Sequence, residues 1–214
     1  MTQKGSGRNM LEQPRALGEQ GEKTRARLME AAAKVFRERG YSGTRVDDIT
    51  QSAGTSHGAF YLYFANKQDV LEALAVETAD EMYALAGRLE GISHGEDGYD
   101  QLRAWIDAFV DSYERHLPVV NAWIAAESED TRFDRLGREV LSKFAGRIST
   151  TIERAVDDGL RHPVHPGTAA VALVAMLERL SYFWLVRGAE FRRYTVVDTV
   201  AAIWYESIFG QRAR

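Results

Sequence analysis

One short stretch of the sequence combines very small residues with hydrogen-bonding side chains. His57 and Tyr61 are four residues apart, so a helix places them one turn apart on the same face. Gly58 and Ala59 lie between them and have almost no side chain, which lets such a helix approach a groove closely. An imidazole and a phenol on this face can reach base edges or phosphates. The stretch therefore predicts a surface that reads nucleic acid.

Two short helices are expected to hold this surface. Thr44 followed three residues later by Asp47 reads as a capping box for the first of them. Gly54 supplies the positive φ of a tight turn, and Ser56 can cap the second helix at once. A helix of about two turns, a tight turn and a second short helix predict a helix-turn-helix motif.

Flanking helices complete this N-terminal unit. Apolar residues from Leu28 to Phe36 recur at helical spacing, and Gly40 stops that helix. After the motif, Asn66 caps a long helix that carries Lys67 at its N-terminus, where free N–H groups and the helix dipole favour a phosphate. Phe60 and Phe64 are assigned to the core.

Charge is divided unevenly along the 214 residues. The whole chain has a net charge of −4, but the part up to Lys67 has 11 basic and 7 acidic residues, a net +4, which leaves −8 for the remainder. This asymmetry favours a basic end that meets polyanions and an acidic body that does not. Residues 1–20 are polar and aperiodic and are expected to form a disordered arm, either a solvated leader or a segment that touches phosphates.

Composition narrows the class of protein. With no cysteine, the chain has neither disulfides nor thiolate chemistry. No run of apolar residues reaches the length of about 18 that a membrane span needs. The N-terminus has no apolar signal-peptide core either, so a cytoplasmic protein is expected. Only four prolines and long periodic stretches predict an all-α fold, with helices following one another to Phe209 and no credible strand.

A second group of candidate functional residues consists of large apolar and aromatic residues after residue 98. Large rings contributed by several helices leave irregular voids, which favours a pocket for a small apolar ligand, and the Tyr hydroxyls could orient that ligand. Ordinary bundle core is the competing interpretation for each residue. The candidate ligand-binding residues are Leu102, Ile106, Phe109, Tyr113, Trp123, Phe144, Ile148, Leu177, Tyr182 and Trp204.

The sequence contains little evidence for a catalytic or metal site. His162 and His165 have a spacing that could bind a metal, but they are flanked by prolines and lack a nearby acid, so no metal and no cofactor are expected. The alternative to a DNA-binding protein is a small helical enzyme with a lipid-like substrate in the aromatic cavity. Salt-dependent binding to duplex DNA separates these two functions, because the enzyme predicts none.

The segment from Thr44 to Lys67 resembles the DNA-binding signature of the TetR family of repressors. The Ala-Gly-x-Ser, Phe-Tyr-x-Tyr-Phe and Asn-Lys elements occur together and in register, and the resemblance extends over about residues 24–74. Two C-terminal segments, residues 172–179 and 203–210, look like the end of the mycobacterial repressor of ethionamide activation. Val174 and Leu177 stand where that relative has pocket asparagines, which argues against amide hydrogen bonds to a ligand there.

The resemblance implies an all-α homodimer with residues 21–66 as the DNA-binding domain and residues 67–214 as a helical-bundle domain for ligand binding and dimerisation. Its function would be that of a regulator, as repressor or activator, released from a palindromic double-stranded operator by a small apolar or amphipathic inducer. Helices over 167–187 and 195–209 are the expected dimer surface, and no membrane partner is expected. The implied DNA contacts are Thr44 and Arg45 to phosphate, Ser56, His57, Gly58, Ala59 and Tyr61 on the reading helix, and Tyr63 and Lys67 to the backbone.

Overall fold

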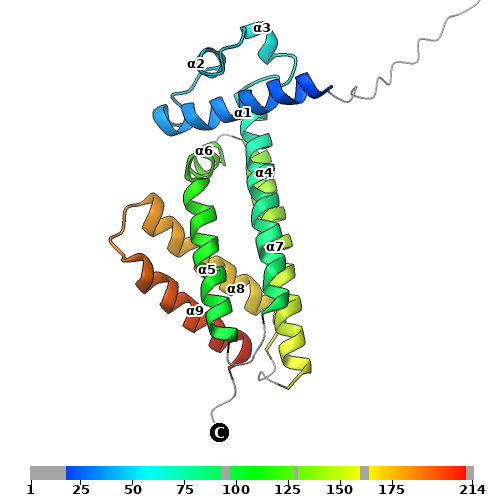
Figure 1. Ribbon diagram of the computed structural model, residues 1–214, viewed down its shortest axis with the longest axis vertical. Coiled ribbons are helices and arrows are strands. Elements are labelled where there is room, and N and C mark those ends of the chain that lie inside the picture. The colour runs from blue at the N-terminus through cyan, green and yellow to red at the C-terminus, as the bar shows by residue number, and fades with distance from the viewer. Residues whose placement is uncertain (1–17, 93–96, 128–129, 160–163, 211–214) are drawn as a thin grey trace, which may run out of the picture.

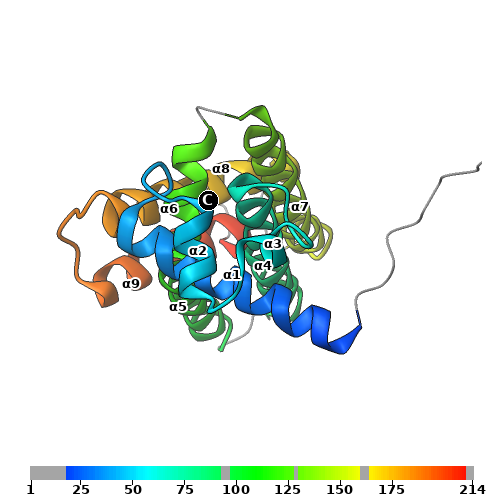
Figure 2. The same ribbon diagram turned by 90° about the horizontal axis from the view of Figure 1, so that it is seen from above.

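The computed structural model describes residues 18–92, 97–127, 130–159 and 164–210, and these residues form helices and connecting turns without a strand. The molecule is elongated (Figure 1). Helices α1 to α3 lie across one end, and α4 runs from that end down the long axis beside α7. Seen from above, the first three helices cover that end of the bundle (Figure 2). The expected all-α fold is confirmed.

The N-terminal unit consists of α1 (Glu19–Arg39), α2 (Val46–Ser52) and α3 (His57–Phe60). Helix α1 begins at Glu19, so the last two residues of the predicted arm are helical, and residues 1–17 lie outside the described part. Gly40 ends α1 with φ of +69°, a conformation that suits a residue without a Cβ atom.

Helix α4 (Lys67–Gly87) continues directly from the N-terminal unit into the body of the protein. As the sequence predicts, Asn66 caps it: its side-chain oxygen accepts a hydrogen bond from the backbone N–H of Asp69 at 2.9 Å. The short 3₁₀ helix η1 (Arg88–Gly91) follows α4.

Five further helices and one π-helical turn build the remainder. They are α5 (Gly98–Arg115), α6 (Leu117–Glu127), α7 (Thr131–Asp157), α8 (Pro166–Ser181), η2 (Tyr182–Val186) and α9 (Arg193–Phe209). His162 lies outside the described residues, while His165 caps α8 by accepting from the N–H of Thr168 at 3.1 Å. The described residues contain no cluster of metal-ligating side chains.

The buried apolar residues of the described part form two hydrophobic cores. One core lies between α5, α7, α8 and α9. The other joins α1, α2 and the first half of α4 to residues of the C-terminal half, namely Val119, Ala122, Ala126 and Phe133 from α6 and the start of α7. Helix α6 is therefore packed into the N-terminal unit, because its apolar face completes the core that the short helices α2 and α3 are too small to close.

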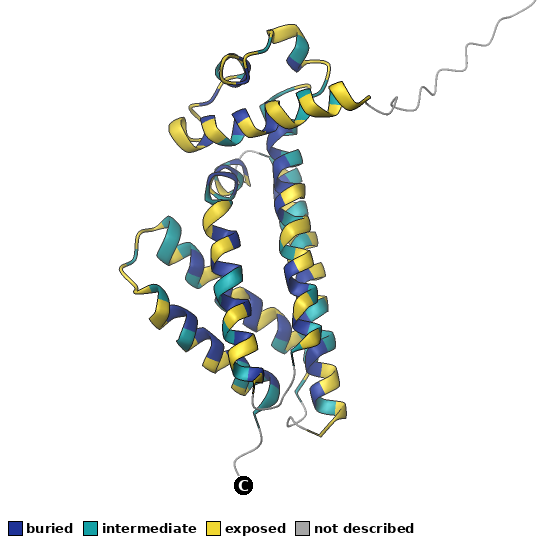
Figure 3. Cartoon of the chain, viewed as in Figure 1, coloured by how far each residue is buried: buried dark blue, intermediate teal, exposed yellow. Residues whose placement is uncertain are grey.

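Helices α8 and α9 carry many residues that are exposed or only partly buried (Figure 3). The continuous segment Pro166–Val186 has a mean hydropathy of 1.6 and is long and apolar enough to cross a membrane by length and composition, with 28% of the scored stretch buried. This corrects the expectation that no segment meets that test. Large apolar residues exposed on α8, η2, α9 and the turn between them are Val171, Phe183, Phe191, Tyr194 and Ile203.

Candidate nucleic-acid interface and ligand core

The turn between α2 and α3 has the geometry that the sequence predicts. Gly54 adopts φ of +61°, and the N–H of Thr55 donates to the carbonyl of Thr50 at 3.0 Å. Ser56 then caps α3, with its hydroxyl oxygen accepting from the N–H of Ala59 at 3.1 Å. These bonds fix the angle between α2 and α3, and hence the direction in which α3 faces solvent.

Helix α3 and the turn after it present a continuous outward face. The rings of His57 and Tyr61 meet edge to face with centroids 5.0 Å apart, as their spacing predicts. Tyr61 is 51% exposed, and a methyl group added at Gly58 would meet no atom within 4 Å. Phe60 is fully buried on the opposite side, as expected. The face can therefore lie against another surface without disturbing the core.

Leu62 is a residue of this face that the sequence analysis missed. It is 77% exposed, the highest value among the large apolar residues described. An exposed Leu beside a Tyr on a reading helix suits apolar contact with a thymine methyl group. Its position directly after Tyr61 could have revealed it, but helical periodicity alone does not say that α3 ends at Phe60 and turns Leu62 outward.

An acidic group also reaches this face. Asp47 in the first turn of α2 lies 3.1 Å from Nε2 of His57, and both side chains are largely exposed. The pair joins α2 to α3 on the outer side. It also places one negative charge next to the surface that is expected to meet a polyanion.

The start of α2 differs from the prediction by one residue. Arg45, not Thr44, is the N-cap residue, and its backbone N–H donates to Oδ2 of Asp48 at 2.9 Å. The hydroxyl of Thr44 instead donates to the carbonyl of Gly40 at 2.7 Å, and the residue is only 2% exposed. The hydroxyl of Thr44 is thus turned inward, and contact of Thr44 with a phosphate stays a prediction. Arg45 is exposed at the helix N-terminus and has no side-chain partner among the described residues.

Lys67 has a structural role that the sequence did not reveal. Its ammonium group donates to the carbonyls of Tyr41 and Thr44, at 2.8 and 3.1 Å, and lies 4.4 Å from the centre of the Tyr41 ring. Two of its three hydrogens are therefore used to hold the connection between α1 and α2. Contact of the third hydrogen with a phosphate stays a prediction, as does backbone contact by Tyr63, which is half-buried.

Eight of the ten predicted ligand-binding residues come together in the core between α5, α7, α8 and α9. Their rings form a connected series: Phe109 lies 6.1 Å from Tyr113 and 6.0 Å from Phe144. The members in this core are Leu102, Ile106, Phe109, Tyr113, Phe144, Ile148, Leu177 and Trp204.

Trp123 and Tyr182 lie apart from this group. Trp123 belongs to the other core, where it packs on Phe133 and donates from Nε1 to Glu127 at 3.1 Å. Tyr182 is half-buried at the C-terminal end of α8, with the Arg179 guanidinium 5.1 Å from its ring centre. The sequence could not assign Trp123, because either core can take an aromatic residue from α6.

Trp105 is the central aromatic residue that the analysis missed. Its ring lies 5.4 Å from Trp204 and 6.2 Å from Phe144, and its Nε1–H donates to the carbonyl of Leu85 at 2.8 Å. It is three residues after Leu102 and four before Phe109, so the helical spacing of the predicted stripe already included its position.

The core contains polar atoms with unusual surroundings. Burial raises the pKa of the Tyr113 phenol, and the negative charge of Glu178 raises it further. Burial also raises the pKa of Glu178, opposed by Arg179, whose Nε lies 3.8 Å from the carboxylate. Tyr113 therefore stays protonated and can donate a hydrogen bond.

Polar contacts tie α4 to the helices of the C-terminal half. His116, which ends α5, lies 3.3 Å from the hydroxyl of Thr78 and 2.9 Å from the carboxylate of Glu81. Nearer the N-terminal unit, Arg132 of α7 contacts Asp69 and Glu72 of α4, each at 3.3 Å. These contacts join α5 and α7 to α4, whose N-terminus carries the helix-turn-helix.

Comparisons with known proteins identify relatives of this chain. Residues 28–74 match the family described as bacterial regulatory proteins, tetR family, and residues 102–210 match the C-terminal domain of the transcriptional regulator EthR. The chain is 35% identical to the HTH-type transcriptional regulator TtgR of Pseudomonas putida, over 78% of this chain and 83% of that one. It is 23% identical to EthR of Mycobacterium tuberculosis, over 86% of each chain. In structure it is similar to FadR of Bacillus subtilis in complex with stearoyl-CoA, with a TM-score of 0.66, 17% identity and coverage of 87% and 99%.

Proposed function

The chain belongs to the TetR family of bacterial transcriptional regulators, and from that premise we propose that it is a homodimeric repressor which a small apolar ligand releases from a palindromic operator. The family and the relatives are transcriptional regulators, not enzymes. The observation that carries the proposal is the outward face of α3, with His57, Gly58 and Tyr61 exposed above a buried Phe60.

This face has the chemistry of direct readout in a major groove. Gly58 allows close approach, while the imidazole of His57 and the phenol of Tyr61 supply hydrogen bonds to base edges. Leu62 adds apolar contact. Arg45, exposed and unpaired among the described residues at the start of α2, is placed to fix the register by contacting a phosphate.

A second copy of the chain is the best occupant for the apolar surface of α8 and α9. Exposed apolar residues lie on α8 and η2, namely Val171 and Phe183, and on the turn before α9 and α9 itself, namely Phe191 and Ile203. Exposed apolar patches of this kind mark interaction sites. A two-fold axis through these helices presents two α3 helices to one duplex. The half-sites of the operator then lie about one helical turn, roughly 34–36 Å, apart or a little further.

The aromatic core of α5, α7, α8 and α9 is the proposed ligand site. It collects large rings around Trp105 and Phe109, and its helices also border the α4 contacts at His116. A related fold, FadR of Bacillus subtilis, was solved in complex with stearoyl-CoA, which supports a ligand with a long apolar part for proteins of this shape. Only a ligand that binds the DNA-free conformation more tightly can release DNA.

The proposal is tested by selecting duplexes bound by the purified protein from a random pool, and by measuring their release with a panel of apolar compounds. We expect an enriched palindrome, binding that weakens steeply with salt, and release by at least one compound class. No enrichment over random sequence would overturn the proposed repressor. Enrichment of a single, non-repeated half-site would overturn the homodimer.

A further inference from the structure

Two buried hydrogen-bond donors in the aromatic core have no partner in the described structure. The hydroxyl of Tyr113 and the Nε1–H of Trp204 are both unbonded, although the residues are 3% and 0% exposed. The neighbouring Trp105 shows the usual situation, since its indole N–H is bonded to the carbonyl of Leu85. Buried donors are nearly always satisfied, so two unsatisfied ones in a single core suggest that something supplies acceptors there.

Ring contacts connect these two donors through Trp105 and Phe109, whose rings stack with centroids 6.1 Å apart, and Phe144 contacts both of these rings. The ring of Phe144 lies 6.2 Å from Trp105, which contacts Trp204, and 6.0 Å from Phe109, which contacts Tyr113. Phe144 therefore packs against the centre of the series that leads to both unsatisfied donors.

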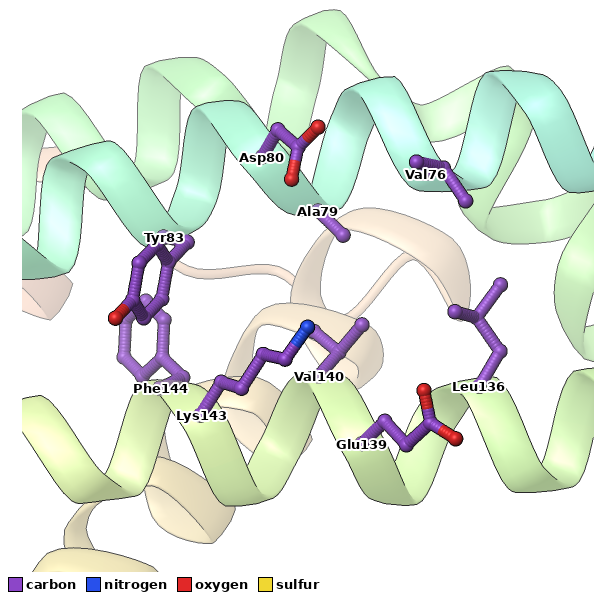
Figure 4. A pocket seen from close by; sticks show the side chains of 9 residues that line it. All are labelled: Val76, Ala79, Asp80, Tyr83, Leu136, Glu139, Val140, Lys143 and Phe144. Carbon is purple, nitrogen blue, oxygen red and sulfur yellow. The ribbon is translucent and has the colours of Figure 1, made fainter.

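The same phenylalanine also lines a surface groove between α4 and α7 (Figure 4). The groove has a volume of about 450 Å³, large enough for part of a small organic molecule. Its apolar wall includes Val76, Ala79, Leu136 and Val140, and the aromatic residues Tyr83 and Phe144 also line it. Phe144 thus separates the groove from the aromatic core.

The charges around this path disfavour an anionic ligand. The groove carries two carboxylates, Asp80 and Glu139, against the single ammonium group of Lys143, and none of the three has an ion-pair partner in the described residues. On another side of the core, the half-exposed Glu178 carboxylate acts on Tyr113. A third buried donor without a partner, Nε of Arg147, belongs to a guanidinium that is already paired with Glu90 at 2.5 Å.

We propose that the inducer is an uncharged, elongated apolar molecule with a carbonyl or ether oxygen, which enters through the α4–α7 groove, displaces the ring of Phe144 and accepts hydrogen bonds from Tyr113 and Trp204. This inference rests on the proposed function and specifies its ligand. An alkane would leave both donors unpaired. A carboxylate would bury a charge beside Glu178 in a core without a free cation, which is costly. An amine brings no acceptor in its charged form.

The first test compares ligands of one chain length on the full-length protein by isothermal titration calorimetry. The probes are methyl decanoate, undecane, decanoate and decylamine. We expect methyl decanoate to bind at least about tenfold more tightly than the other three, since each satisfied donor contributes on the order of one hydrogen bond. Tighter binding of decanoate or decylamine, or no binding of any probe, would overturn the inference.

The second test removes each donor and keeps its ring. Tyr113→Phe and Trp204→Phe are expected to weaken binding of methyl decanoate by about five- to tenfold each and to leave undecane unchanged. Trp184→Phe, which alters a partly buried indole at the edge of the same core, is the matched control and should change neither. Equal affinities for the ester in all three variants would contradict the assignment of the donors.

A third measurement tests whether the ring of Phe144 blocks the path from the groove into the core. Phe144→Ala should speed association of methyl decanoate in stopped-flow fluorescence by about tenfold or more, whereas Val140→Ala on the groove wall should not. An unchanged association rate in Phe144→Ala would overturn the proposed entry through the α4–α7 groove. DNA binding is measured in parallel. A protein that binds its selected operator but has equal affinity for the four probes refutes this inference alone. A protein that binds no DNA refutes the proposed function.

Discussion

The ammonium group of Lys67 lies 2.8 Å from the backbone carbonyl oxygen of Tyr41, directly above the ring of the same residue. The contact spans 26 positions of the sequence and ties the first turn of α4 to the end of α1. Lys67, which the sequence assigns to phosphate binding, thus also stabilises the helix-turn-helix unit.

Lys67→Ala is therefore expected to destabilise the protein as well as weaken DNA binding. Loss of charged hydrogen bonds to two carbonyls should lower the free energy of unfolding by roughly 1–2 kcal/mol in a urea titration. Lys34→Ala, at an exposed lysine of α1, is the control and should stay within about 0.5 kcal/mol of the wild type. If Lys67→Ala is as stable as the control and only lowers the salt dependence of DNA binding, the lysine acts on phosphate alone.

Tyr61→Ala should weaken operator binding without unfolding the protein. The side chain is half exposed, so we expect a loss of about 1–3 kcal/mol in binding, measured by fluorescence anisotropy, and little change in melting temperature. Phe60→Ala, one residue earlier and fully buried, should instead cost about 3–5 kcal/mol of stability. Reversed results for the two variants would mean that α3 is rotated from its position here.

Phe183→Lys combined with Phe191→Lys should separate the proposed dimer. Both side chains are about half exposed in the single chain, and burying an ammonium group in an apolar interface is unfavourable. Analytical ultracentrifugation should show monomers that remain helical and bind the full operator weakly. Leu141→Lys, at an exposed leucine of α7, is the control. A variant that still sediments as a dimer would place the interface on another face.

Glu81→Gln tests the contact between α4 and His116 through its pH dependence. The hydrogen bond from His116, assisted by the charges of His116 and Arg115, lowers the pKa of Glu81 below its ordinary value of 4.5. A lowered pKa in the folded state stabilises the protein above the unfolded pKa, and that contribution is lost as pH falls through the folded pKa. Because Glu81 is half exposed, we expect about 0.2–1 kcal/mol at pH 7.

The comparison for Glu81 uses chemical denaturation of the wild type and the variant at neutral pH and at about pH 3. The difference between the two proteins should shrink toward zero at the lower pH. A difference that is the same at both values would show that the carboxylate charge does not contribute through His116.

Much of the helix-turn-helix could be predicted from sequence because local rules determine it. Gly54, Ser56 and Asn66 act through bonds to residues within four positions, and each behaves as expected. The roles of Lys67 and Thr44 could not be predicted in this way. The partners of Lys67 are set by how α1, α2 and α4 pack, and no periodicity encodes a lysine that folds back over a distant carbonyl. The partner of Thr44 is the local carbonyl of Gly40, but the sequence pattern also allowed Thr44 to cap α2.

The ligand core was predicted in composition more than in arrangement. The stripe from Leu102 to Tyr113 is buried as its spacing indicates, yet Trp123 joins the other core although it is equally aromatic. Which core receives α6 depends on the short connection at His116 and on the apolar face left open by α1 and α4. These are tertiary features, which the periodicity of a single helix does not encode.

The proposed repressor function depends most on α3 reading a specific duplex. The direct measurement is the anisotropy of a labelled duplex that carries the selected palindrome, titrated with protein beside a scrambled duplex at the same salt concentration. We predict binding to the palindrome about a thousandfold or more tighter than to the scrambled duplex, with two chains per duplex. Equal affinity for the two duplexes, or no binding to either, would contradict it.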